Sequence, residues 1–129
     1  MISTQDIVDW LNAQDATINA IVGPFVPDMP DALCVLTLVS GPGILLEGAI
    51  DGIAVQARVR GQQRNPTDAE TRAYRVDNLI IEASKPAAIG SHWLTDAYRL
   101  GGTPAPVQND LDGERVNFTA TYVFEVGRL

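Results

Sequence analysis

Two arginines on one predicted strand are the residues of this sequence whose type and spacing best suit recognition chemistry. Gln56, Arg58 and Arg60 alternate with apolar residues in the segment VQARVRG, at the two-residue period of a β-strand. The alternation predicts a strand over residues 53–60 that turns its apolar side chains toward the core and the two arginines away from it. A planar guanidinium group pairs well with carboxylates and phosphates. The arginines could therefore meet a substrate anion, a nucleic acid or a neighbouring protein subunit.

The overall charge argues against nucleic acid as a tightly held partner. The 129 residues include nine Lys and Arg against sixteen Asp and Glu, which gives a net charge of −7, and Lys85 is the only lysine. Proteins that bind nucleic acid without regard to sequence need a basic surface. We expect no such binding, although DNA could pass along an acidic surface without being held there.

Side chains that commonly carry catalysis or bind metals are scarce. His92 is the only histidine and Cys34 the only cysteine, so one chain cannot build a multi-histidine or thiolate metal site. We expect His92 to be an ordinary strand residue, and Cys34 to be buried and unreactive within the apolar run ALCVLTLV. The NDLDGE segment, residues 109–114, lacks the ligand spacing of an EF-hand and predicts an Asp-Gly turn. We therefore expect no enzymatic activity, no cofactor and no metal.

The arginines also have an interpretation that needs no partner at all. The exposed face of a strand often carries charges because water covers it, and such charges discourage unwanted pairing between sheet edges. Surface ion pairs are in addition weak and seldom diagnostic of function. The spacing alone leaves a solvated face and a subunit contact equally open.

Two helices are predicted around the arginine strand. The first begins after Ser3, with Asp6 in the position of a capping box, and we expect it to continue weakly to Ile21. The second begins after the N-cap Asn65 and ends before Lys85, with small and branched apolar residues at helical spacing along one side. Its opposite side is polar and predicted to face water.

Four strands complete the predicted elements. They cover residues 33–39, 53–60, 91–100 and 115–126. The first is apolar throughout, which is typical of a central strand covered on both faces. The last alternates between an aromatic face and a polar face. Three glycines interrupt residues 43–52, so we expect a loop there that leaves room for a short strand. Proline and glycine dominate residues 101–115, which predicts a long exposed loop.

The hydropathy pattern predicts a soluble protein. The N-terminal residues MISTQDIVDW do not form a signal peptide pattern. No apolar run approaches the roughly 20 residues that are needed to cross a bilayer.

The order of these elements resembles the tail terminator and minor capsid proteins of long-tailed bacteriophages. A capped helix, a Pro-rich connection, an apolar strand, the strand VQARVRG and a helix opened by NPTDAE follow each other along nearly the whole chain. The segment PAPVQNDLDGERVNFTATYVFEV adds a proline loop and an acidic turn with Gly-x-Arg before the last strand. These patterns are typical of the family, but none of them is a catalytic signature.

This resemblance implies a fold, a role and a set of partners. The fold is α+β, a single domain over residues 1–129 with a mainly antiparallel four-stranded or slightly larger sheet flanked by two helices. Such proteins form a ring, here expected to be a hexamer, that caps the tail tube, stops its growth and joins the tail to the head-side connector or stopper. Viral DNA passes through the ring without specific binding. The expected location is the virion, after synthesis in the bacterial cytoplasm and without a membrane stage.

The residues expected at the contacts between copies in such a ring are Gln56, Arg58, Arg60, Asp110, Asp112 and Arg115. Two alternatives stay open from the sequence. The chain could be another neck or tail subunit, such as a head-closure or tail-tube protein. It could instead be a small anion-binding α/β domain or enzyme that uses Arg58 and Arg60, which would need a concave pocket beside them.

Overall fold

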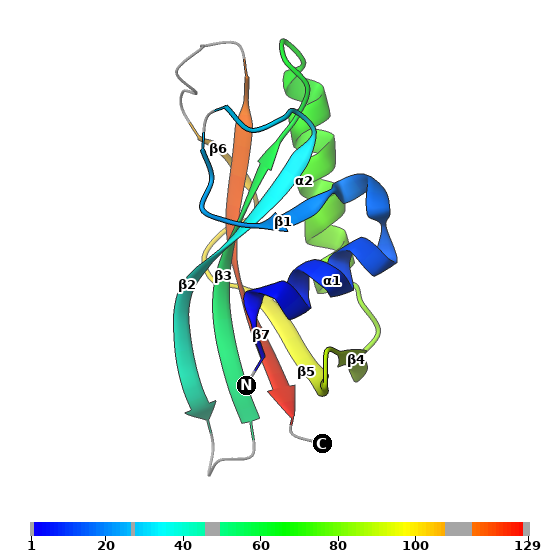
Figure 1. The fold of residues 1–129 in the computed structure, drawn as a ribbon, viewed down its shortest axis with the longest axis vertical. Coiled ribbons are helices and arrows are strands. Elements are labelled where there is room, and N and C mark those ends of the chain that lie inside the picture. Colours follow the sequence, from blue (N-terminus) through cyan, green and yellow to red (C-terminus); the bar gives the residue numbers. More distant parts are fainter. Residues whose placement is uncertain (1, 27, 46–49, 108–114, 128–129) are drawn as a thin grey trace.

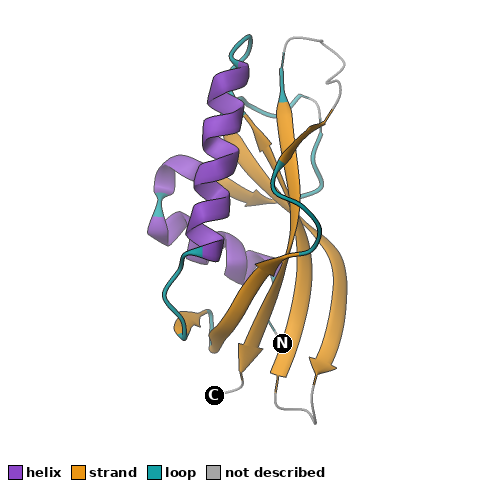
Figure 2. Cartoon of the chain, turned by 180° about the vertical axis from the view of Figure 1, so that it is seen from behind, coloured by secondary structure: helices purple, strands orange, loops and turns teal. Residues whose placement is uncertain are grey.

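Two helices pack on one face of a curled sheet of seven strands (Figures 1 and 2). The computed structural model describes residues 2–26, 28–45, 50–107 and 115–127. Its elements in chain order are α1 (Thr4–Gln14), a 3₁₀ turn (Ala16–Ile18), β1 (Ala20–Val22), β2 (Leu33–Leu45), β3 (Ile50–Arg60), α2 (Pro66–Ile81), β4 (Ala87–Ile89), β5 (His92–Arg99), β6 (Ala105–Val107) and β7 (Asn117–Gly127).

The strand order is β1-β2-β3-β7-β5-β4, and β6 pairs with the first residues of β7. The pair β1–β2 is parallel, and the other pairs are antiparallel. The α+β class and the two helices agree with the sequence prediction, whereas the sheet is larger than four strands and mixed. Three short strands, β1, β4 and β6, account for the difference, because three residues are too few to show a period.

Both helices begin where their capping residues predict. The Ser3 hydroxyl accepts a hydrogen bond from the Asp6 amide, the Asp6 carboxylate accepts one from the Ser3 amide, and Asn65 caps α2. The predicted continuation of the first helix to Ile21 is wrong. Asp15 leaves the helical conformation and its side chain binds the Thr17 amide, so the chain turns and then enters β1.

The predicted loop over residues 43–52 is wrong for residues 43–45 and 50–52, because β2 and β3 extend into this segment and pair antiparallel there, while residues 46–49 lie outside the described residues. Two register irregularities between Leu38 and Gly43 admit the glycines without ending the pairing. Likewise, among residues 33–39 of β2, whose burial is described, only residues 33–36 are covered on both faces. Leu38 and Val39 are each 54% exposed.

The core lies between the sheet and the helices, and the aromatic face of β7 forms its centre. Tyr122 and Phe124 are 1% and 0% exposed and belong to one buried cluster with Val76 and Ile80 of α2, as the alternation in the sequence predicts. Cys34 is fully buried, and burial raises the pKa of its thiol to about 12. Among the described residues, no helix is long and apolar enough to cross a membrane.

Candidate subunit interface

The two arginines lie where the sequence predicts, on the face of the sheet opposite the helices, which we call the outer face. Arg58 pairs in register with Thr119 of β7, and Arg60 pairs with Asn117. Val59, between them, faces the helical core. The prediction of which side chains share a face is therefore confirmed.

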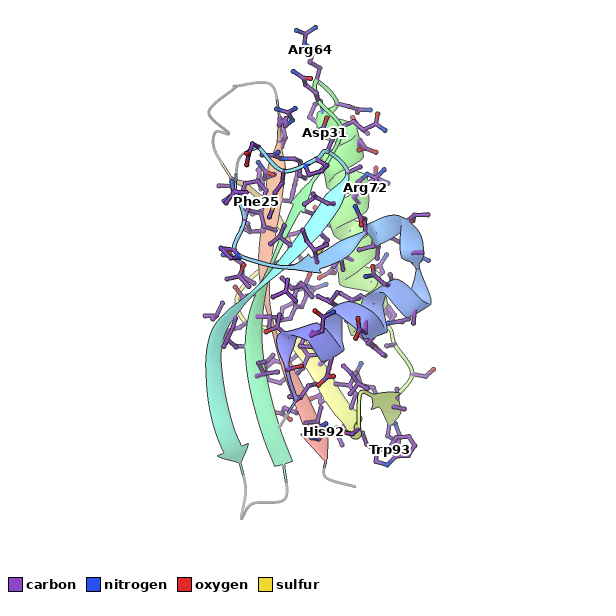
Figure 3. The ribbon with its side chains drawn as sticks, in the orientation of Figure 1. Phe25, Asp31, Arg64, Arg72, His92 and Trp93 are labelled. Atoms are coloured by element: carbon purple, nitrogen blue, oxygen red, sulfur yellow. The ribbon has the colours of Figure 1, made fainter. Side chains whose placement is uncertain are left out.

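The outer face at this end of the sheet is covered by the chain itself. Residues 23–26 and 28–32, which we call the strap, connect β1 to β2 and carry Phe25 over the arginines. Figure 3 labels Phe25 and Asp31 of the strap. The ring of Phe25 lies 4.0 Å from the guanidinium carbon of Arg58 and 4.7 Å from that of Arg60. Arginine stacks well on aromatic rings, so Phe25 joins the strap to both side chains.

Arg60 is consequently buried, which corrects the expectation that both arginines are accessible to a neighbouring copy. Its side chain is 0% exposed, and its Nη1 donates a hydrogen bond of 2.8 Å to the carbonyl of Met29 in the strap. Arg58 is only partly buried. A strand alternation shows which face a side chain takes, but it does not show what covers that face.

The remaining residues expected at subunit contacts fall into three groups. Arg115 is bound within the chain, since its Nε donates to the carboxylate of Asp31 in the strap. Gln56 is partly buried on the outer face, in the same row as Thr37 of β2. Asp110 and Asp112, with the rest of the NDLDGE segment, lie outside the described residues. A role for any of these residues between copies stays a prediction.

Backbone contacts fasten the strap at both ends. The Gly23 amide donates to the carbonyl of Leu36 at 2.7 Å, and the Ala32 amide donates to the carbonyl of Gly61 at 3.4 Å. A Cβ atom at Gly23 would come within 2.3 Å of the Thr37 hydroxyl oxygen, so only glycine permits this approach. The strap is therefore a built part of the fold that covers one end of the sheet.

A buried carboxylate that the sequence did not single out lies on the helix face. Asp77 of α2 is 3% exposed and accepts two hydrogen bonds from Arg99 of β5, at 2.7 and 2.6 Å, and one from the hydroxyl of Tyr122 at 2.7 Å. The Arg99 hydrogen bonds, more than the one from Tyr122, hold the pKa of Asp77 below its ordinary value of 3.8, although burial opposes them. Burial, assisted by Asp77, raises the pKa of Tyr122.

This triad ties α2 to β5 and β7, and its groups satisfy one another. Nothing in the sequence pattern identifies it, because Asp77 occupies a helix position next to the apolar stripe and Arg99 ends a strand. A polar residue at the edge of an apolar stripe is the one signal that could have directed attention to it. Its place in the core and its mutual pairing assign it to stability.

The structure has a cleft of 240 Å³ between α2 and the 3₁₀ turn. Its polar lining consists of Thr17, Asp68, Thr71, Arg72 and Arg75. Arg72 is bound by Asp68 and Arg75 by Asp15, at 2.9 and 3.0 Å. The cleft does not include Arg58 or Arg60, which the anion-binding alternative requires.

Within the described part of the chain, no three His, Cys, Asp or Glu side chains are placed so as to hold a metal ion. His92 is a partly buried residue at the start of β5, as predicted, and Trp93 beside it is 44% exposed (Figure 3).

No protein-family model and no curated protein sequence matches this chain. The solved structures to which it is similar include a chain in the structure titled "Virion of native gene transfer agent (GTA) particle". The TM-score is 0.58 at 14% sequence identity, over 91% of this chain and 84% of that chain. This likeness shows the fold. It covers nearly the whole chain.

Proposed function

We propose that this protein is a structural, non-enzymatic component of a phage-type virion that forms a ring at the end of the tail tube. The observation that carries the proposal is the fold likeness to a chain of the gene transfer agent virion. It agrees with the independent resemblance of the sequence to tail terminator proteins. The ring ends growth of the tube and joins it to the head-side connector, and DNA passes through it.

The electrostatics of the chain support this role. A net charge of −7 per copy gives a ring of several copies a strongly acidic surface, which repels the phosphate backbone of DNA that must move past it. The arginines that could have held DNA are occupied by the strap instead, with Arg60 fully buried. A passage for DNA needs a wall to which DNA does not adhere.

Deletion of the gene in a cell that produces the particle tests the role. The expected products are filled heads and separate tails that do not join, with tube lengths more variable than in the wild type. Complementation with the intact gene should restore joined particles. Loss of all tails would instead identify a tube subunit, and heads that lose their DNA would identify a head-closure protein. Normal particles in normal yield would refute the structural role.

A further inference from the structure

The sheet has two unpaired edges that lie at the same level on its opposite sides. β1 pairs with β2 only over Cys34–Leu36, and β4 pairs with β5 only over His92–Leu94. Among the described strands, none pairs with the following residues of β2 or of β5 on these outward sides. Figure 1 shows the two edges on opposite sides of the sheet, with β3 and β7 between them.

The register across the sheet places the two edges level with each other. Leu38 pairs with Val55, Val55 with Tyr122, and Tyr122 with Arg99. In the same way, Gly43 of β2 pairs with Gly52, Gly52 with Glu125, and Glu125 with Asp96 of β5. A neighbouring copy turned about an axis along the strands would therefore bring its β5 beside this β2 without sliding along it.

The strand directions also suit such a contact. β2, β3, β7 and β5 are successively antiparallel, so β2 and β5 run in opposite directions. Rotation about an axis along the strands preserves these directions. The new pair would be antiparallel, which is the more stable kind of ladder and continues the pattern of the sheet.

The backbone groups at both edges point outward. The Leu36 carbonyl and the Cys34 amide bind toward β1, so alternation turns the amide and carbonyl of Leu38 to the same side, beyond the end of β1. On β5, the Leu100 amide binds toward β7, which turns the groups of Arg99 to the opposite, outward side. Leu38 and Arg99 thus present matching groups at one level.

Apolar side chains accompany both edges. Leu38 and Val39 are each 54% exposed beside the β2 edge, and Tyr98 and Leu100 are 39% and 56% exposed beside the β5 edge. Exposed apolar edge strands are the ones that pair with another chain. Two features limit unwanted pairing: Pro42, in the later part of β2, has no amide hydrogen to donate, and the Asp96 carboxylate accepts a hydrogen bond from the Ala97 amide at 2.8 Å.

We propose that the β2 edge around Leu38 pairs with the β5 edge around Arg99 of a second copy, so that the sheet continues from copy to copy around the ring. The two surfaces differ, so the contact is head-to-tail, and a contact of this kind forms a closed ring when the rotation between copies closes. This inference rests on the proposed function and names the surfaces by which the ring is built. Backbone pairing joins the copies, and the exposed apolar side chains add to it.

Two single variants and their mixture test the contact by native mass spectrometry. Leu38→Lys blocks the β2 edge and Tyr98→Lys blocks the β5 edge, while Tyr74→Lys is the control, since Tyr74 is 41% exposed on α2. Each blocked variant alone should lose the ring and remain monomeric. Their equimolar mixture should form one-to-one pairs, because each copy retains the edge that the other needs. The control should form rings as the wild type does.

Cross-linking covers the case of weak association in solution. The double variant Val39→Cys with Tyr98→Cys, treated with a short bis-maleimide, should give a ladder of multimers, whereas either single variant should give none. Buried Cys34 does not react. Rings formed by either blocked variant would overturn the edge contact. So would a mixture that forms no pairs together with a double cysteine variant that gives no ladder. In both cases, rings formed by the wild type would still support the proposed function. A wild-type chain that forms no ring, alone or in particles, would overturn both.

Discussion

The two ends of the sheet differ in what covers them. At the end formed by Leu33–Leu36 and residues 117–119, which we call the covered end, β1 and β6 extend the sheet and the strap lies over its outer face, so that Val35 and Arg60 are 0% exposed. At the open end, beyond Leu36 of β2 and Leu94 of β5, each outer strand is paired on one side only among the strands that the structure describes. The same long strands thus complete a fold at one end and leave it open at the other.

The difference shows where a further chain can be accommodated. The short strands β1 and β6 and the strap together use few residues, and they cover one end of the sheet. Among the described residues, no such segments cover the open end. An edge left unpaired in this way favours association with another copy over a solitary chain. The arginines thus lie at the covered end, and the contact that we propose between copies lies at the open end.

The largest effect is expected from the core that both ends share. Phe124→Ala removes a fully buried ring that packs edge-on against Trp10, and should lower the free energy of unfolding by about 3–5 kcal/mol. The matched control is Tyr98→Ala on β5, which is 39% exposed and should change stability far less. Urea denaturation followed by circular dichroism measures both. Equal losses for the two variants would show that the two faces of the sheet are assigned the wrong way round.

Removal of the buried carboxylate should have the next largest effect. Asp77→Ala leaves Arg99 and Tyr122 without their common acceptor and should lower the free energy of unfolding by about 3 kcal/mol. Asp96→Ala, an exposed acid on the open edge, is the control. If both variants unfold at the same urea concentration as the wild type, the triad does not stabilise the fold.

The same triad predicts a pH dependence with a definite sign. The pKa of Asp77 is lower in the folded chain than its ordinary value of 3.8, so folding favours the ionised carboxylate. This contribution is fully present above pH 3.8 and is lost as the pH falls through the lower, folded-state pKa. As the pH is lowered through this range, the midpoint temperature of thermal unfolding should therefore fall more for the wild type than for Asp77→Asn. Parallel curves for the two proteins would contradict the assignment.

A smaller loss should follow when the strap is loosened at the covered end. Arg60→Met removes the hydrogen bond to the Met29 carbonyl and the stacking on Phe25, and should lower the free energy of unfolding by about 2 kcal/mol. It should also admit protease cleavage within the strap. Leu38→Lys at the open end should do neither. A strap that resists proteolysis equally in all three proteins would show that Arg60 does not hold it.

Arg58 tests whether the covered end also takes part in a contact between copies, as the sequence analysis expects. Arg60 is buried under the strap, so we expect a substitution there to disturb the fold as well as any subunit contact. The single variant Arg58→Glu remains informative, since Arg58 is only partly buried. If it folds and weakens the ring, Arg58 contributes to a subunit contact. If it folds and forms normal rings, assembly depends on the open end alone.

The smallest expected effect is a difference in thiol reactivity between two sites on one strand. Cys34 lies where β1 covers β2, and its raised pKa and burial should keep it unlabelled by a bulky maleimide in the native protein. A cysteine placed by Leu38→Cys on the open part of the same strand should react rapidly. Similar labelling rates at the two sites would remove the distinction between the covered and open ends.

Local signals predicted the elements that the chain specifies locally. The capping residues Ser3 and Asn65 gave the starts of both helices, and the alternation of β7 gave its core face, because neighbouring residues alone determine these features. The three glycines predict a loop over residues 43–52, whereas residues 43–45 pair with residues 50–52, and residues 50–52 pair in turn with β7, a strand remote in sequence. No local pattern predicts that the strap covers Arg60 or that Asp77 binds Arg99, because both contacts join residues far apart in the sequence.

The position of the subunit in an intact particle tests the central claim most directly. Cryo-electron microscopy of the junction between head and tail should show this chain as a closed ring at the end of the tail tube, with the β2 edge of each copy beside the β5 edge of the next. A structure that places the chain elsewhere in the particle, or that lacks it altogether, would contradict the claim.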